Sequence, residues 1–237
     1  MIILVFALLL GLSTFALVAF LFGIIPAILP SIAAILVAYF VSARQVSKRL
    51  ETAMIEAQTE MQKGRVDRGL ALLNSAKNRF KYWQFFTQSA LDGQIGSIYY
   101  LRQEFDRARP YLEKSFIRHW IARGMLGVLF SRQKDYEKMD KAFDTALRYS
   151  SKQGLLWSLW AYCHWKAGHQ DKAIDILLQG QKKLGDADPR LSANLANLQN
   201  SKKMKMRGYG EQWYQFHLEM SPQMKEMRSR QTRFVQR

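Results

Sequence analysis

The sequence predicts an all-α protein in which an N-terminal transmembrane helical hairpin is followed by an α-solenoid of paired helices. Two observations support this prediction. No charged residue precedes Arg44, so the whole formal net charge of +16 falls on the positions after the apolar front. After that front, a pattern of small and bulky residues recurs along a chain that is rich in helix-forming residues and poor in hairpin turns.

The composition excludes two classes of protein. At 49% hydrophobic and 13% aromatic residues, the chain has the composition of a protein with a core, which excludes a long disordered polymer. The single cysteine, Cys163, has no partner for a disulfide, which excludes a disulfide-stapled secreted domain.

Residues 1–42 are long enough for two membrane crossings, because one crossing needs about 20 apolar residues. We expect a first span over about 2–22 and a second over about 26–42. The two spans meet at residues that interrupt a helix: Gly23, Pro26 and Pro30. A cleaved signal peptide and a single tilted or re-entrant span remain alternatives, although no basic n-region precedes the apolar run.

Charge predicts the orientation of this hairpin. Arg44, Lys48 and Arg49 follow the second span, whereas the turn between the spans carries no charge. Since basic flanks stay in the cytoplasm, we expect a multi-pass inner-membrane protein with both termini on the cytoplasmic side. An unpaired Cys163 agrees with a reducing compartment.

The rest of the chain repeats a helical pair. The first helix of each pair carries a small residue at its centre: Gly96, Gly127 and Ala161. The second helix brings a bulky apolar residue to that position: Leu112, Phe143 and Leu177. A small residue three positions later admits the next pair: Ser115, Ala146 and Gly180. Stacking of such pairs buries one continuous core.

This pattern resembles the tetratricopeptide repeat (TPR) family, and the resemblance covers somewhat over half of the chain. It implies TPR-like helical repeats within 43–200, at about 50–82, 89–119, 120–153 and 154–187. Met139 and Gly69 stand where the family usually has alanine, and the spacing of the copies varies. A generic bundle of helical hairpins is the alternative. For 201–237 we expect a basic C-terminal helix and tail, in which Trp213, Phe216 and Met220 share one helical face.

No residues with catalytic or metal-binding spacing are found. The four histidines lack the spacing of metal ligands, and no phosphate-binding loop is present: His119, His164, His169 and His217. Cys163 lies on the apolar side of an expected helix and fits a core position. We therefore expect neither an enzyme nor a cofactor.

The resemblance implies that a protein partner binds in a groove lined by the first helix of each pair. Carried over by position, that groove presents Tyr100, Val128, Arg132, Tyr162, Trp165 and Lys166, with Gly124, Ser131 and Ser158 beside them. The lysine and asparagines of the family's carboxylate clamp are missing. Arg132 and Lys166 stand at equivalent positions of successive repeats, so they either bind an acidic ligand or are solvated surface charges.

Other basic residues flank the repeats and suit anionic lipid headgroups or an acidic partner: Arg44, Lys48, Arg49, Lys202, Lys203, Lys205 and Arg207. These features favour a membrane-anchored scaffold or adaptor that recruits a protein partner at the cytoplasmic face of the membrane, as part of a larger complex. Its hairpin contains small residues that would let another membrane protein dock: Gly11, Ser13, Ala16, Ala27, Ser31 and Ala34. The alternatives are a membrane-tethered nucleic-acid or ribosome binder and a regulatory subunit of a membrane enzyme. The lack of a nucleic-acid motif argues against nucleic acid as a partner.

Overall fold

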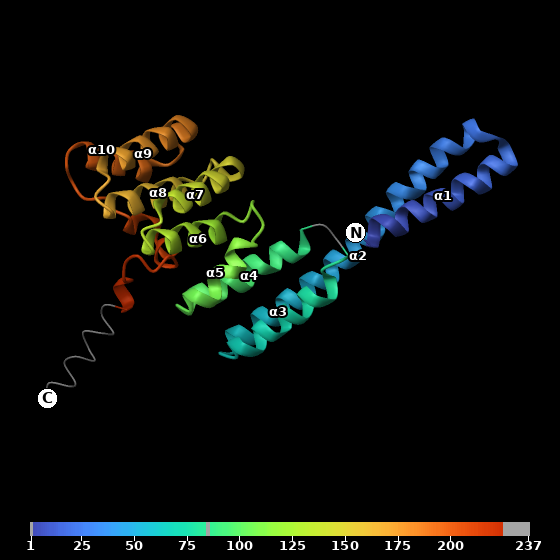
Figure 1. Cartoon of the computed structure of the whole chain (residues 1–237), viewed down its shortest axis with the longest axis horizontal. Coiled ribbons are helices and arrows are strands. Elements are labelled where there is room, and N and C mark those ends of the chain that lie inside the picture. Colours follow the sequence, from blue (N-terminus) through green and yellow to red (C-terminus); the bar gives the residue numbers. More distant parts are fainter. Residues whose placement is uncertain (1, 84–85, 225–237) are drawn as a thin grey trace. The chain divides into compact units, whose positions relative to one another are not determined.

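The computed structural model describes residues 2–83 and 86–224, and within these ranges every regular element is helical (Figure 1). The all-α class expected from the sequence is therefore confirmed. The chain forms two compact units, Met1–Ile95 and Gly96–Arg237. The boundary between them falls inside α4 (Thr87–Leu101).

The first unit begins with a helical hairpin. Helix α1 spans Ile2–Phe22 and packs against the first half of α2, which spans Ile24–Gln62 (Figure 1). Gly23 makes the turn with a φ of 93°, a conformation that glycine adopts without strain. Close contact follows at Gly11, where an added Cβ would lie 2.1 Å from the side chain of Ile35.

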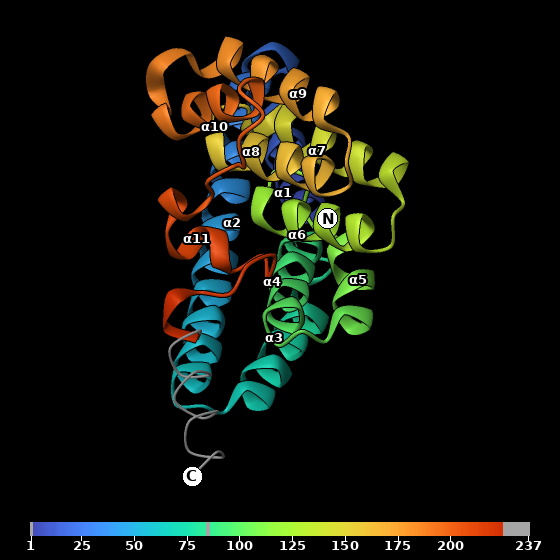
Figure 2. The same cartoon turned by 90° about the vertical axis from the view of Figure 1, so that its left-hand side faces the viewer.

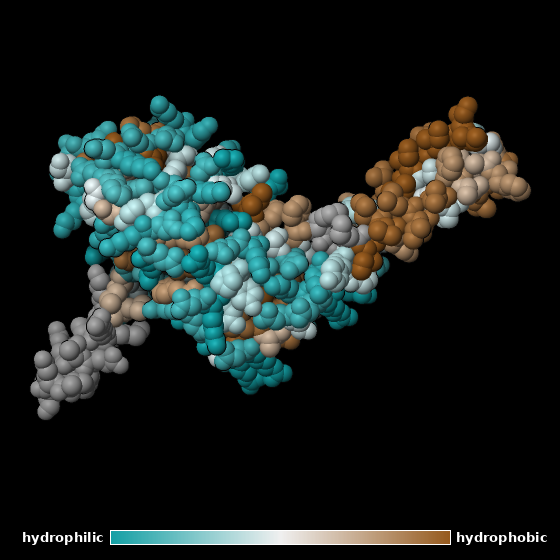
Figure 3. All heavy atoms as spheres, in the orientation of Figure 1, coloured by the Kyte–Doolittle hydropathy of each residue, from teal (hydrophilic) through white to brown (hydrophobic). Residues whose placement is uncertain are grey.

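The surface of this hairpin is apolar. In Figure 3 its atoms are predominantly brown, and most of its large side chains are exposed, including Phe20 at 88% and Ile25 at 83%. Both helices are long and apolar enough to cross a membrane. A signal sequence can have the same length and composition. The residues buried between them are mostly small: Ile3, Ala7, Gly11, Ala27 and Ser31. Three of the small residues expected to receive another membrane protein, Gly11, Ala27 and Ser31, are therefore used within the hairpin itself.

Helix α2 does not end at residue 42, where the second span was expected to end. It continues to Gln62 because residues 43–62 contain helix-forming side chains and neither glycine nor proline. Its second half packs against α3 (Val66–Phe80) to make the first helical pair. Gly69 of α3 allows this contact, since a Cβ there would lie 2.6 Å from Met61.

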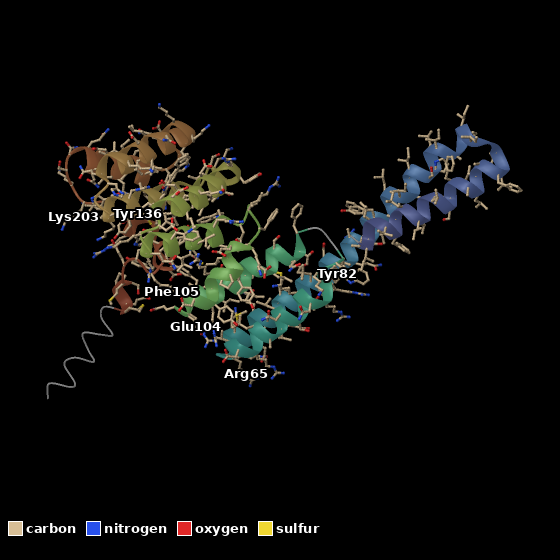
Figure 4. All side chains as sticks on the ribbon, in the orientation of Figure 1. Arg65, Tyr82, Glu104, Phe105, Tyr136 and Lys203 are labelled. Carbon is tan, nitrogen blue, oxygen red and sulfur yellow. The ribbon has the colours of Figure 1, made fainter. Side chains whose placement is uncertain are left out.

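Further helical pairs follow along the chain. They are α4 with α5 (Phe105–Glu113), α6 (Trp120–Arg132) with α7 (Tyr136–Ser150), and α8 (Gly154–Lys166) with α9 (Gln170–Leu184). The short η1 (Gly185–Ala187) leads to α10 (Pro189–Gln199), which packs on α8 and α9. Phe105 and Tyr136 begin the second helices of two consecutive pairs (Figure 4).

The turn within each pair has one recurring geometry. Its residue with positive φ is Gly64, Gln103, Lys134 or Gly168, with values between 60° and 88°. The following amide donates to a carbonyl five residues earlier, as from Asp135 N to Phe130 O at 3.0 Å. This turn occurs in the pair formed by α2 and α3 as well as in the later three. The same turn thus recurs even where the sequence repeat is loosest.

The expected packing of small against bulky residues is observed. A Cβ on Gly127 would lie 2.5 Å from the ring of Phe143, and one on Gly96 would lie 2.9 Å from Leu112. Both bulky side chains are fully buried. These close approaches set the distance between the two helices of a pair and give α6 and α7 a common core.

A polar network joins α7, α8 and α9. Asp140 accepts hydrogen bonds from Trp160 Nε1 at 2.7 Å, His164 Nε2 at 2.7 Å and Lys172 Nζ at 2.5 Å. Burial works to raise the pKa of Asp140, but these donors outweigh it and lower the pKa. Burial lowers the pKa of His164, and its Nδ1 lies 3.3 Å from Nδ1 of His169.

Candidate functional site

The candidate site is the face formed by the first helices of the second unit, which we call the first-helix face. Its residues come from the end of α4 and from α6, α8 and α10: Tyr100, Gly124, Arg132, Ser158, Tyr162 and Asn194. Residues 204–220, which we call the C-terminal segment, lie on this face. The segment contains η2 (Arg207–Tyr209) and α11 (Glu211–Tyr214) and runs back past α8 and α6 to the end of α4 (Figure 2).

At α10 the segment is held through its backbone. Asn194 Oδ1 accepts a hydrogen bond from Lys205 N at 2.7 Å, and Asn194 Nδ2 donates to Lys205 O at 3.4 Å. An amide side chain that both donates to and accepts from one residue's backbone holds an extended chain whatever its side chain is. Met204 and Met206 are buried on either side.

At α8 the segment is held through aromatic side chains. The hydroxyls of Tyr209 and Ser158 lie 2.8 Å apart, and the Arg190 guanidinium lies 4.4 Å from the centre of the Tyr209 ring. Farther along, the edge of Trp213 meets the Tyr162 ring at 4.7 Å. Tyr209 is 5% exposed and Trp213 is fully buried.

One carboxylate of the segment completes the contact with α8. Tyr162 donates its hydroxyl to Glu219 Oε1 at 3.0 Å, and Trp213 Nε1 donates to Glu219 Oε2 at 3.3 Å. Burial first, and then the hydrogen bond and charge of Glu219, raise the pKa of Tyr162. Tyr162 therefore stays neutral and acts as a donor at physiological pH.

Toward α6 and α4 the segment offers carbonyl groups. Tyr100 donates to Phe216 O at 2.7 Å, and Arg132 Nη2 donates to His217 O at 2.8 Å. Gly124 leaves room for the Phe216 ring, because a Cβ there would lie 3.2 Å from it. Phe216 is fully buried as a result.

The structure thus brings together three of the six residues expected in the groove, Tyr100, Arg132 and Tyr162, on one bound segment. Trp165 and Lys166 lie beside Tyr162: its ring centre is 5.5 Å from that of Trp165 and 5.6 Å from Lys166 Nζ. Val128 is fully buried within the hydrophobic core. Ser158 and Gly124, also expected beside the groove, contact Tyr209 and Phe216.

The other residues expected to bind a partner or lipid lie outside the first-helix face, except Lys205 and Arg207, which belong to the C-terminal segment. Arg44, Lys48 and Arg49 are exposed on α2, and Lys202, Lys203, Lys205 and Arg207 are exposed after α10, where Figure 4 labels Lys203. Cys163 is buried, which raises the pKa of its thiol to about 12 and fits a core position. Among the described residues, no group of three or more His, Cys, Asp and Glu side chains is placed to hold a metal ion.

No pattern in the sequence indicated that residues 204–220 occupy this face. For residues 201–237 a basic helix was expected, but residues 202–206 form no helix, and only four residues form α11. Trp213 and Phe216 are buried, whereas Met220 is 45% exposed and does not share their position. Positive φ angles at Gly210 and His217 bend the segment so that it follows the first-helix face. Residues 225–237 of the expected tail lie outside the described residues.

Comparison with known proteins agrees with this geometry. Residues 122–153, which comprise most of α6 and all of α7, match the family model described as tetratricopeptide repeat. The chain therefore contains a TPR, and the resemblance drawn from its residue pattern is supported at this pair. No curated protein matches the chain to a significant degree.

Proposed function

We propose that this TPR-containing chain is a membrane-anchored scaffold whose first-helix face binds an extended segment of a protein partner. The observation that carries the proposal is the set of contacts to backbone atoms on that face. Asn194, Tyr100 and Arg132 all bond to main-chain atoms of the C-terminal segment. Such contacts suit any extended polypeptide, and repeat proteins bind partners through surfaces of this kind.

The helical hairpin supports anchoring in a membrane. Helix α1 has 21 residues, a length of about 31 Å at 1.5 Å per residue, which matches a hydrocarbon core about 30 Å thick. In water, the exposed side chains of α1 and of the first half of α2 would each be unfavourable. In lipid the same side chains are at low free energy, and both helices satisfy their own backbone hydrogen bonds.

The start of α1 marks one edge of the proposed membrane layer. Because Gly11 faces Ile35 across the antiparallel hairpin, Ile2 falls opposite Arg44, the first charge of the chain. Ile2 N also donates to Tyr82 O at 2.9 Å, and the Tyr82 side chain is 60% exposed (Figure 4). Aromatic and basic residues at one level are typical of a membrane–water interface.

Charge supports a cytoplasmic location for the repeats. Arg44, Lys48 and Arg49 are exposed just beyond this edge, and the turn at Gly23 has no charge. We infer two spans of the inner membrane, with both termini in the cytoplasm. The basic surface then faces anionic headgroups, and the repeats recruit a partner within a larger membrane complex.

Cysteine labelling tests the membrane part of this proposal. Tyr149→Cys places a thiol at a site that is 50% exposed, while the native Cys163 is buried and has a raised pKa. A membrane-impermeant maleimide should label position 149 only after the cells are permeabilised. Labelling in intact cells would contradict a cytoplasmic repeat domain, and a soluble product lacking residues 1–42 would instead identify a signal sequence.

Site-specific photo-crosslinking tests the partner part. A photoreactive residue replaces Lys166, which is exposed beside Tyr162, or replaces Lys141, which is exposed on the second helix α7. We expect a specific protein adduct in native membranes from position 166 and none from position 141. The adduct should survive nuclease treatment. Equal capture at both positions, or capture that depends on nucleic acid, would contradict binding at the first-helix face.

A further inference from the structure

The contact between the C-terminal segment and the first-helix face is partly polar. Hydroxyl and amide groups of four face residues point at the segment: Tyr100, Ser158, Tyr162 and Asn194 are 0% to 1% exposed and each makes a hydrogen bond to it. A permanent core seldom needs such groups, since buried polar atoms cost free energy unless each is satisfied. A face that also meets water in another state does need them.

Charge on the face is not neutralised by the segment. Arg132 bonds to a carbonyl and lies 4.4 Å from the Phe105 ring, and Lys166 lies 5.1 Å from the Trp165 ring. Among the described residues neither cation forms an ion pair within 4.0 Å. The segment carries two basic residues, Lys205 and Arg207, and two acidic residues, Glu211 and Glu219, so it brings no net negative charge to a chain whose net charge is +16. An acidic polypeptide would therefore gain attraction on this face that the resident segment lacks.

The resident segment also leaves space. A cavity of about 690 Å³ lies between the start and the end of the segment and is lined by residues 204–208, Glu219 and Met220. The segment is joined to α10 by a short polar connection, residues 200–203, in which Ser201 has a positive φ. The segment can thus leave the face without breaking a helix of the repeats.

Resting on the proposed function, we propose that residues 204–220 are an exchangeable occupant of the first-helix face, and that the partner replaces them with an acidic, extended segment. The partner segment would carry two aromatic residues three positions apart and a carboxylate three positions further on. This is the arrangement of Trp213, Phe216 and Glu219. Its additional acidic residues would meet Arg132 and Lys166.

Competition in cis sets the expected behaviour. A tethered segment competes at an effective concentration in the millimolar range, so a peptide added in trans binds the intact chain weakly. Substitutions that weaken the binding of the resident segment reduce this competition and leave the residues of the face unchanged. The apparent affinity for the added peptide should then rise by the same factor as the fraction of chains whose face is free.

The test uses the full chain in lipid nanodiscs and a fluorescent peptide with the sequence of residues 203–220. We expect the chain variant Trp213→Ala/Phe216→Ala to bind this peptide at least tenfold more tightly than the unsubstituted chain. The control chain Met220→Ala should bind like the unsubstituted chain, because Met220 is 45% exposed. A peptide with Glu219→Gln should bind the double variant several-fold more weakly, since it loses the charged acceptor of Tyr162.

A second peptide tests the charge preference. Replacing His217, which lies beside Arg132, by glutamate should tighten binding to the double variant, and added salt should reduce that gain. If neither peptide binds a folded double variant, or if the double variant loses its helical circular dichroism, the segment is a fixed part of the core and the proposal is wrong. If the peptides fail while position 166 still captures a protein in membranes, the scaffold function stands and only the exchange is refuted.

Discussion

The burial of Phe216 gives a quantitative prediction for the variant Phe216→Ala. The Phe216 side chain is fully buried, with its ring close to Gly124, and its carbonyl is bonded by Tyr100. Burying a phenylalanine contributes about 1.5–3 kcal/mol. The space left by the ring on this face can fill with water, so the free-energy cost of a sealed cavity is not added. A loss of about 2 kcal/mol increases the opening of the segment about 30-fold.

Hydrogen exchange followed by mass spectrometry measures this opening in the full chain. Amides of residues 204–219 should exchange about 30-fold faster in Phe216→Ala than in the unsubstituted chain. Amides of α6 to α9 should keep their protection, because the contacts within each helical pair, such as that of Gly127 with Phe143, do not involve this ring. Met220→Ala provides the matched control in the same segment, and we expect it to leave exchange unchanged.

Two results would refute this reasoning. Faster exchange throughout α6 to α9 would mean that the segment and the repeats unfold as one cooperative unit. Unchanged exchange of residues 204–219 would mean that Phe216 contributes nothing to holding the segment. In either case the energy assigned to Phe216 from its burial would be wrong.

Three further predictions concern the repeats. Gly127→Ala should lower the free energy of unfolding by about 1–3 kcal/mol, measured by denaturation in nanodiscs, because its Cβ would meet the ring of Phe143. Lys134→Gly should raise it by about 0.5–1 kcal/mol, because φ there is 60°, whereas the same change at the helical Lys138 should lower it. His164→Gln should reduce the loss of thermal stability on acidification, since the folded state holds this histidine neutral below its ordinary pKa of 6.5.

The sign of the pH effect follows from the surroundings of His164. Burial, Lys172 and His169 lower its pKa and outweigh Asp140, so the unfolded chain binds a proton more readily than the folded one. Its contribution to stability is complete above about pH 6.5 and is lost as the pH falls below that value. A thermal midpoint equally sensitive to pH in His164→Gln would contradict the assignment. For Gly127→Ala and Lys134→Gly, an unchanged free energy of unfolding would contradict the packing and the turn strain.

The sequence predicted the paired helices because their contacts are local and repeated. Small residues such as Gly96 and Gly127 recur at a spacing typical of stacked helical pairs, and their partners Leu112 and Phe143 are buried as expected. The two apolar helices of the hairpin were predicted equally well, because their residues are uncharged up to Arg44. The continuation of α2 to Gln62 was missed because a change in polarity at Ser42 was taken as the end of a helix, although the backbone meets no breaking residue there.

The candidate site was only half predictable. Tyr100, Arg132 and Tyr162 could be placed by position, since equivalent residues of a repeat point the same way. The occupant could not, because its contacts with α8, α6 and α4 join residues 51 to 116 positions apart and no local pattern encodes them. The available signal was an aromatic group, Trp213 and Phe216, in a stretch beyond the last repeat, where exposure to water would be unfavourable.

Exchange of the resident segment for a partner can be measured by photo-crosslinking from position 166 in native membranes. The yield of the partner adduct is compared between the unsubstituted chain and Phe216→Ala. If the first-helix face receives a partner in exchange for the resident segment, the variant should give several-fold more of the same adduct. A yield that is unchanged or lower in a folded Phe216→Ala chain would contradict exchange at this face.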